Sequence, residues 1–210
     1  MRAHHNGHEH ELEPQYGLPE LLPADEQIVW QGSPVATEVF QTVFHGRALI
    51  AYFLAMVALR MVLSAGSGEG GGATAAAAAG MAAVFGLALA GFWLMAWLTA
   101  KTTVYTVTSK RLILRIGIVL NVTFNVPWSR IASADLRIRK HGAGDIAFRL
   151  VPEDKIAYLH LWPHARPWHF SHPEPMLRGL ADVRQVSEVI LRTVPLSQPI
   201  RHETDLQTAR

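Results

Sequence analysis

The chain contains two long apolar stretches, residues 46–64 and 73–100. The hydrocarbon core of a bilayer is about 30 Å thick, and a helix of about 20 apolar residues crosses it. The second stretch is long enough to cross with a tilt. The first is shorter and carries Arg60 near its far end, where a long side chain can reach the lipid headgroups. The pattern predicts two transmembrane helices; a buried core helix is the alternative for the first stretch.

The segment between the two stretches, residues 65–72, is rich in glycine and contains no lysine or arginine. Arg47 flanks the first stretch, whereas Lys101 and Lys110 follow the second. The positive-inside rule therefore predicts a periplasmic loop and two cytoplasmic termini in a multi-pass membrane protein. An acidic head, residues 1–45, precedes the first stretch, so this stretch does not have the pattern of a cleaved signal peptide.

The remainder of the chain, after Lys101, shows the alternation of apolar and polar residues that is typical of half-buried strands. Gly117 is a turn candidate between two of these runs. Their short, regular spacing predicts a small antiparallel sandwich or barrel. The expected strands are 102–109, 111–117, 118–126, 131–140, 145–151 and 156–162.

The pattern changes again near the C-terminus. From Leu180 to Val194, apolar residues recur every three or four positions, which predicts an amphipathic helix that ends at Pro195. The expected fold is a membrane α-hairpin of two transmembrane helices plus a cytoplasmic pleckstrin-homology-like (PH-like) antiparallel β-barrel capped by this helix. The expected divisions are a disordered histidine-rich head (1–15), an N-terminal cytoplasmic segment (16–45), the transmembrane helices with their loop (46–100), the PH-like domain (101–195) and a disordered tail (196–210).

Charge is distributed unevenly along the chain. The net charge is −5 for residues 1–47 (2 basic, 7 acidic), zero for 48–100 (1 basic, 1 acidic) and +7 for 101–210 (16 basic, 9 acidic). Basic residues near a membrane attract anionic headgroups by about 1 kcal/mol each. We expect such contacts rather than nucleic-acid binding, and no specific inositol-phosphate site. The candidates for headgroup contact are Arg47, Lys101, Lys110 and Arg111.

Small residues gather on the second apolar stretch, and they allow helix backbones to approach closely in lipid. Gly86 and Gly91 are five positions apart, so they do not form a GxxxG motif. The predicted helix–helix contact residues are Gly80, Gly86 and Gly91. Their partner is the first helix, a second copy in a homodimer, or another protein.

The segment YLHLWPHARPW, residues 158–168, combines aromatic rings, histidines and an arginine. In a strand over 156–162 one set of alternate side chains faces outward and the other faces the core. Tryptophan, tyrosine and arginine are enriched at protein interfaces. The alternative is that the tryptophans fold over the C-terminal helix and close the core. The predicted partner-docking residues are Tyr158, His160, Trp162, His164, Arg166 and Trp168.

Candidate catalytic groups are scattered. Asp135, Asp145 and His160 fall on different predicted strands, and the sequence contains no P-loop, GxGxxG, HExxH or GxSxG motif. The absence of cysteine excludes disulfides and cysteine nucleophiles. The histidine-rich head (His4, His5, His8 and His10) has no neighbouring group to fix a metal geometry. We therefore expect a protein that is not an enzyme and has no metal or cofactor.

Several segments resemble known families. LPADEQIVWQGSP (22–34) and VYTVTSKRLILRIG (104–117) are similar to bacterial membrane-attached PH-like proteins. Together with GDIAFRL (144–150) and YLHLWPHARPW, they resemble the PuhB family of photosynthetic-complex assembly proteins of purple bacteria, over roughly residues 16–192. The resemblance implies a non-enzymatic inner-membrane (intracytoplasmic-membrane) factor that acts on reaction-centre subunits, with a secondary effect on the core light-harvesting complex.

That resemblance also raises the question of pigment. The magnesium of bacteriochlorophyll is usually held by a histidine on a membrane helix, and neither apolar stretch contains one. His45 precedes the first stretch by one residue, so we expect no pigment binding unless His45 provides it. The alternative function is that of a general membrane-anchored PH-domain protein that senses anionic lipid or membrane stress. Gene neighbourhood and salt-sensitive binding to anionic liposomes distinguish the two functions.

Overall fold

The computed structural model describes residues 16–18, 20–68, 70–118, 120–151, 156–193 and 201–202. The histidine-rich head and most of the C-terminal tail lie outside these residues. The chain forms two compact units, one of residues 36–100 and one of residues 1–35 together with 101–210. We refer to them as the helical unit and the PH-like domain, and each is described by itself.

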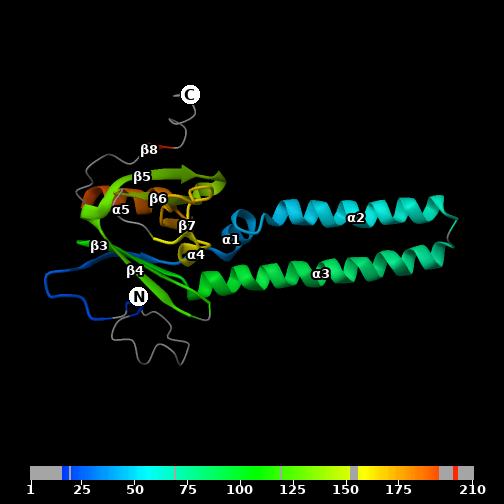
Figure 1. Ribbon diagram of the computed structural model, residues 1–210, viewed down its shortest axis with the longest axis horizontal. Coiled ribbons are helices and arrows are strands. Elements are labelled where there is room, and N and C mark those ends of the chain that lie inside the picture. The colour runs from blue at the N-terminus through cyan, green and yellow to red at the C-terminus, as the bar shows by residue number, and fades with distance from the viewer. Residues whose placement is uncertain are drawn as a thin grey trace. The chain divides into compact units, whose positions relative to one another are not determined.

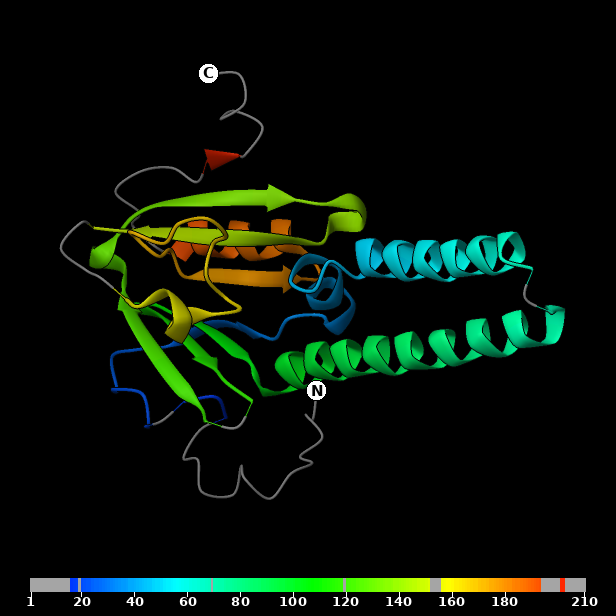
Figure 2. The same ribbon diagram turned by 45° about the vertical axis from the view of Figure 1, so that its right-hand side comes forward.

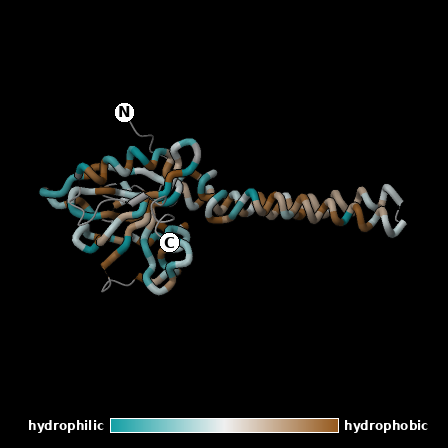
Figure 3. Tube along the Cα trace, turned by 90° about the horizontal axis from the view of Figure 1, so that it is seen from above, coloured by the Kyte–Doolittle hydropathy of each residue, from teal (hydrophilic) through white to brown (hydrophobic). Residues whose placement is uncertain are grey.

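The helical unit consists of α1 (Ala36–Thr42), α2 (Gly46–Gly66) and α3 (Gly71–Thr102). Both long helices are apolar and long enough to cross a membrane, and only 6% of each candidate span is buried. Brown and pale residues accordingly follow one another along them in Figure 3. The small buried fraction excludes the alternative of a buried core helix for the first stretch. The helices are compatible with a membrane location.

Aromatic rings hold the helical unit together. Phe53 of α2 stacks on Phe85 of α3, with ring centroids 4.4 Å apart and planes inclined by 10°. Nearer the start of α2, Phe40 of α1 meets Trp93 edge-on at 5.5 Å. Aromatic pairs of this kind contribute about 0.5–1.5 kcal/mol beyond the area they bury. They fix α2 and α3 as an antiparallel pair.

The PH-like domain contains two four-stranded sheets, each with its strands side by side (Figures 1 and 2). The first has the order β1-β2-β3-β4 and is antiparallel throughout. The second has the order β7-β6-β5-β8, in which β8 pairs in parallel with β5. The strands are β1 (Ile28–Gly32), β2 (Val104–Thr108), β3 (Arg111–Ile116), β4 (Val122–Pro127), β5 (Ile131–Ile138), β6 (Gly144–Leu150), β7 (Met176–Leu180) and β8 (Arg201–His202).

The core of the domain lies where the sheets and α5 (Val183–Thr193) meet. The predicted apolar face of this helix is confirmed, because Val183, Val186 and Ile190 are buried against strand residues such as Phe148. Burial of each such side chain contributes about 1.5–3 kcal/mol. The sheets are not closed into a barrel, so the expectation of a barrel was wrong.

The first strand of the domain precedes the helical unit in the chain. Gly32 of β1 pairs with Tyr105 of β2, which follows α3. Residues 16–45, expected to be only an N-terminal segment, therefore contribute an edge strand. The strands before and after the two apolar helices, β1 and β2, therefore lie side by side in one sheet.

The strand expected over 156–162 was also wrong. Residues Tyr158–Leu161 form a single helical turn, α4, in which the amides of His160 and Leu161 approach the carbonyl of Ala157. A strand needs a neighbouring strand for its backbone groups, and this segment satisfies several of them locally instead. Leu161 is buried but Leu159 is exposed, so the predicted inward face does not exist.

Two other boundaries differ from expectation. The helix expected from Leu180 begins at Val183, because Leu180 ends β7, which pairs with β6. Gly117 does form the predicted turn, with a φ of 125°. A Cβ atom there would lie 2.0 Å from the Leu120 carbonyl oxygen, so only glycine fits. The next strand starts at Val122, so part of the run expected to be a strand belongs to the turn.

Candidate docking surface

A group of exposed apolar side chains follows the turn α4 in the PH-like domain. The Phe170 ring lies 4.7 Å from the Tyr158 ring and 6.2 Å from that of Trp168, measured between centroids. Leu159 and Trp162 are exposed in the same segment. We call these five residues the aromatic patch. Exposed apolar side chains that gather on one surface mark interaction sites more often than single scattered ones do.

The most exposed member of the patch is Trp168, whose side chain is 84% exposed. Its φ angle is 67°, in the left-handed region that bulky residues seldom adopt. Such a backbone persists only where the surrounding structure enforces it, and these residues cluster at functional sites. Trp168 is thus exposed to solvent although its backbone is strained, and this combination supports an interaction role for the patch.

His164, in the middle of the segment, holds it to the sheet beneath. Its Nδ1 lies 2.7 Å from the Tyr105 hydroxyl, and its Nε2 lies 3.1 Å from the Thr103 hydroxyl. The amide of Met176 donates to the carbonyl of His164 at 2.8 Å. All of these groups are buried. The imidazole is therefore a structural anchor rather than a docking group.

The environment of His164 keeps the ring neutral. Burial lowers its pKa to about 3, and the nearby positive charge of Arg178 acts in the same direction. Burial likewise raises the pKa of Tyr105. Neutral histidine and tyrosine side chains are suited to a dry network, because burying a charge is costly.

An ion-pair network fixes the other side of the segment. Arg166 contacts Asp135 at 2.5 Å and Glu174 at 2.7 Å, and Arg149 donates to Glu174 at 3.0 Å. Both carboxylates are buried. Burial alone would raise the pKa of Glu174, but the hydrogen bonds from the two arginines hold it below its usual value. The network ties the segment to β5 and β6.

The predicted docking residues therefore separate into two groups. Trp162, Trp168 and His160 are exposed, and Tyr158, a member of the aromatic patch, is half-buried. His164 is buried, and Arg166 is held by carboxylates, so neither offers a free side chain; for these two the prediction of a docking role was wrong. The structure adds Leu159 and Phe170, which sequence reasoning missed. Both are apolar residues close in sequence to predicted ones: Leu159 follows Tyr158, and Phe170 lies two positions after Trp168.

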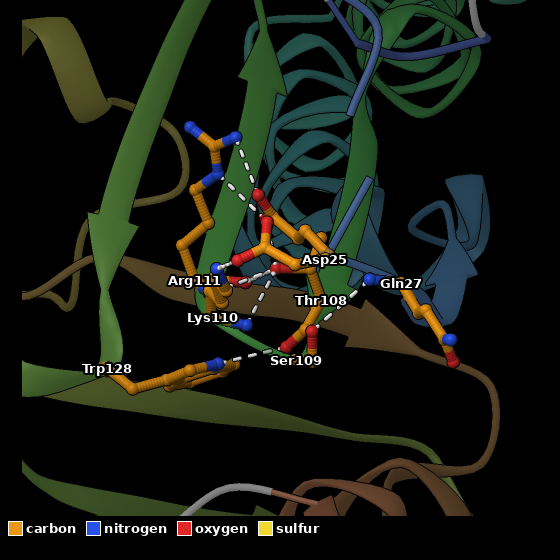
Figure 4. A network of polar contacts seen from close by, with 8 residues as sticks. Asp25, Gln27, Thr108, Ser109, Lys110, Arg111 and Trp128 are labelled. Atoms are coloured by element: carbon orange, nitrogen blue, oxygen red, sulfur yellow. Dashed lines mark hydrogen bonds and ion pairs between the residues drawn. The ribbon is translucent and has the colours of Figure 1, made fainter. Parts of the chain in front are cut away.

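Two of the predicted lipid-contact residues belong to a polar network instead (Figure 4). Arg111 donates two hydrogen bonds to Glu26, at 2.9 and 2.8 Å, and Lys110 is paired with Asp25. The Arg111 hydrogen bonds hold the pKa of Glu26 below its usual value, although burial acts in the opposite direction. Thr108 also donates to Glu26, at 2.6 Å. These groups secure the chain before β1 to the β2–β3 turn, so Lys110 and Arg111 do not present unopposed charges to headgroups.

The other predicted contacts lie at the ends and on the surface of the helical unit. Arg47 and Lys101 are exposed, in the first turn of α2 and the last turn of α3. Gly80, Gly86 and Gly91 are exposed, and a Cβ atom at each would meet nothing within 4 Å. The glycines therefore do not face the first helix, which leaves a second copy or another protein as their predicted partner.

The structure also locates the residues considered above for metal and pigment binding. Within the described ranges, no group of three or more histidine, aspartate or glutamate side chains could hold a metal ion. His45, the only pigment candidate near the helices, has a φ of 53° and directs its Nδ1 to the Val43 carbonyl oxygen at 3.2 Å. The buried ionisable groups around the patch are engaged in holding it in place.

Comparison with known proteins identifies the family of the chain. The model of the bacterial PH domain family matches residues 48–194, so the chain belongs to that family. A relative from Rhodobacter capsulatus, described as an uncharacterized 23.7 kDa protein in the puhA 5′ region, is 36% identical over 188 residues. The alignment covers 87% of this chain and 86% of the relative. No solved structure matches the chain.

Proposed function

We propose that this protein is a PuhB-type, non-enzymatic assembly factor for the photosynthetic reaction centre in the bacterial inner membrane. The relative in the puhA 5′ region supports this function, because it lies near a reaction-centre gene. The apolar helices anchor the protein beside nascent subunits, and the PH-like domain holds one of them. An effect on the core light-harvesting complex follows secondarily from reaction-centre supply.

The aromatic patch is the observation that carries the docking role. Interface hot spots are rich in tryptophan and tyrosine, because large rigid rings bury much area with little loss of entropy. Here the segment that carries the rings is held to the domain by His164 and by the ion pairs of Arg166, which favours a fixed arrangement of the rings. A preformed surface avoids part of the ordering cost of binding.

The membrane topology of the proposal is supported by the β1–β2 pairing. Gly32 and Tyr105 are neighbours in one sheet, yet α2 and α3 lie between them in the chain. Both ends of the helical unit must therefore be on the same side of any membrane that it crosses. The exposed Arg47 and Lys101 at those ends favour the cytoplasmic side under the positive-inside rule. Both termini are then cytoplasmic and the loop is periplasmic.

The test combines a deletion with a surface variant. Deleting the gene should reduce reaction-centre absorption in intact cells, and normal absorption would sink the proposal. The variant Trp162→Ala/Trp168→Ala/Phe170→Ala should lose co-purification of reaction-centre subunits by at least about tenfold, since each hot-spot residue typically contributes 1 kcal/mol or more. Leu191→Ala, an exposed leucine of α5, is the matched control and should retain co-purification.

The second candidate, sensing of anionic lipid or membrane stress, has weaker support. Lys110 and Arg111 are held by carboxylates rather than presented to headgroups. Two results together would favour this candidate over ours. They are salt-sensitive binding of the purified protein to anionic vesicles and normal reaction-centre levels in the deletion strain.

A further inference from the structure

A second group of exposed apolar residues occurs at the turn between β3 and β4. We call the described residues of this turn, 117–118 and 120–122, the apolar turn. Leu120 is 80% exposed, and Ile118 and Val122 are exposed as well. The sequence from Ile116 to Val122 contains no charged residue. Exposed aliphatic side chains gain nothing from water, and their transfer to an apolar medium is favourable.

The strand register fixes where the apolar turn lies. Ile116, the last residue of β3, pairs with Val122, and its neighbour Arg115 pairs with Val104. Paired residues in an antiparallel sheet have Cα atoms about 5 Å apart. Val104 is the first residue of β2 and follows α3, which ends at Thr102. The apolar turn is therefore at the end of the sheet where α3 joins the domain.

The junction with α3 is close to the apolar part of that helix. Trp93 and Trp97, of the residue type that prefers the membrane–water interface, lie in its last third. Because a helix rises about 1.5 Å per residue, Trp97 and Thr102 are about 8 Å apart along its axis. The apolar turn is thus at the end of the domain through which the chain enters from α3.

The opposite end of the same sheet has a different character. The β2–β3 turn carries Lys110, paired there with Asp25, and β4 leads into exposed Ser129 and Arg130. This end is separated from the apolar turn by the length of β4, about 20 Å at 3.4 Å per residue. The sheet is therefore apolar at the end nearest α3 and charged at the far end, as expected for a domain that stands on a bilayer.

The turn also satisfies some of its own polar groups. With its amide in the orientation that satisfies both atoms, Asn121 donates to the Gly117 carbonyl and accepts from Arg115, each at 3.1 Å. Unsatisfied backbone groups are costly in lipid. This internal bond suits a segment that reaches the interfacial region.

We propose that the apolar turn inserts into the lipid interface on the side of the membrane from which α3 emerges. The turn is then a third point of membrane contact and limits tilting of the domain. This inference rests on the membrane anchorage in the proposed function. It concerns a surface separate from the aromatic patch, and its occupant is lipid.

The experiment uses the whole chain, which contains no natural cysteine. Single variants Leu120→Cys, Ile118→Cys, Val84→Cys and Ser129→Cys are labelled with an environment-sensitive fluorophore and reconstituted into phosphatidylcholine–phosphatidylglycerol nanodiscs. Position 84 is an exposed site within α3, and position 129 is the matched exposed site at the far end of the sheet. Quenching by nitroxide-labelled lipids is then measured at each position.

We expect labels at 84, 118 and 120 to be quenched by lipid nitroxides, with at least threefold more quenching at 120 than at 129. Quenching at 84 combined with equal values at 120 and 129 would overturn the inference and leave the membrane anchor intact. A label at 120 that is shielded from water but not quenched by lipid would show a protein occupant, which also overturns it. Absence of quenching at 84 would overturn the proposed anchorage itself, and this inference with it.

Discussion

The helical unit and the PH-like domain use the same apolar residues in opposite ways. In the domain, Leu112 and Phe148 are fully buried among strands and α5. In the helical unit, Leu87 of α3 is 76% exposed, and Leu54 of α2 is similarly open. The domain buries its apolar residues in an interior of its own, whereas the helical unit leaves its apolar residues exposed, which is compatible with a membrane location. The difference teaches that the surroundings decide what an exposed leucine does. In water it is unfavourable, whereas in lipid it stabilises the anchorage of a helix.

The largest expected effect is a loss of stability of the PH-like domain when a buried core residue is truncated. Phe148→Ala removes a ring that packs against Trp128, with centroids 6.2 Å apart, in the centre of the core. We expect a loss of about 3–5 kcal/mol in the free energy of unfolding. Chemical denaturation of the whole chain in mild detergent, followed by tryptophan fluorescence, measures it. Phe170→Ala, at an exposed phenylalanine, should change stability by no more than about 0.5 kcal/mol; equal losses in the two variants would contradict the assigned core.

The helical side is tested by introducing a charge. Leu87→Arg places a guanidinium in the middle of α3, and we expect it to disfavour membrane insertion by about 3–4 kcal/mol. The alkali-resistant fraction of the protein in isolated membranes should fall accordingly. Leu191→Arg, at an exposed leucine of α5, should leave that fraction unchanged. If Leu87→Arg behaves like Leu191→Arg, α3 does not contact lipid at this position.

A smaller effect is expected at the clamp between the N-terminal segment and the β2–β3 turn. Glu26→Gln removes the carboxylate that accepts from Arg111 and Thr108, and hydrogen bonds to charged groups contribute about 1.5–3 kcal/mol. We expect a loss of about 2 kcal/mol in domain stability at pH 7. Because the pKa of Glu26 is lowered by folding, this contribution is present above about pH 4.3 and is lost in acid.

The control for the clamp is Asp25→Asn. Asp25 pairs with Lys110 in an exposed position, where ion pairs contribute little. Its stability should match that of the wild-type protein in the same denaturation experiment. A loss equal to that of Glu26→Gln would show that general charge balance, rather than the buried Glu26 carboxylate, secures this segment.

The smallest effect is a pH dependence from His164. The folded domain keeps this histidine neutral, with a pKa of about 3, whereas the unfolded chain binds a proton below about pH 6.5. Acid therefore favours unfolding, and stability falls as the pH drops from about 6.5 towards 3, by at most about 1.4 kcal/mol per pH unit. Denaturation at pH 7.0 and 5.5 should show this slope in the wild-type protein and in His160→Gln, whose histidine is exposed. The slope should be lost in His164→Gln, and its persistence there would place the proton elsewhere.

Much of the fold could be predicted from the sequence because it depends on local pattern. Length and hydropathy define α2 and α3, alternation defines β5 and β6, and the three-to-four spacing defines α5. Gly117 was predictable as a turn because glycine is itself a turn signal, and the structure shows that no other residue fits there. In each case the signal lies within the segment that adopts the structure.

The missed elements depend on distant partners. β1 was missed because its pairing strand β2 begins at Val104, far along the chain. β7 was missed because it contains Gly179, with a φ of 69°, and a glycine within a short segment indicates a loop rather than a strand. The strand expected over 156–162 failed for the converse reason, since its alternation is regular but no strand among the described residues pairs with it. A periodic pattern is therefore reliable only where tertiary structure supplies the expected neighbour.

The candidate site shows the same limit. Aromatic character identified Trp162 and Trp168, but burial of His164 follows from hydroxyls on Thr103 and Tyr105, about sixty positions earlier. Arg166 is engaged by Asp135, which belongs to another strand. Sequence spacing could not distinguish the residues that hold the surface from the residues that form it.

The early position of β1 has a consequence for how the protein is made. Ile28–Gly32 emerges from the ribosome first, yet its pairing partner emerges only after both apolar helices, roughly seventy residues later. At about 5–20 residues per second, this interval lasts several seconds. During translation the N-terminal strand therefore stays unpaired until both helices have been synthesised, so the sheet cannot be completed before α2 and α3 have been translated.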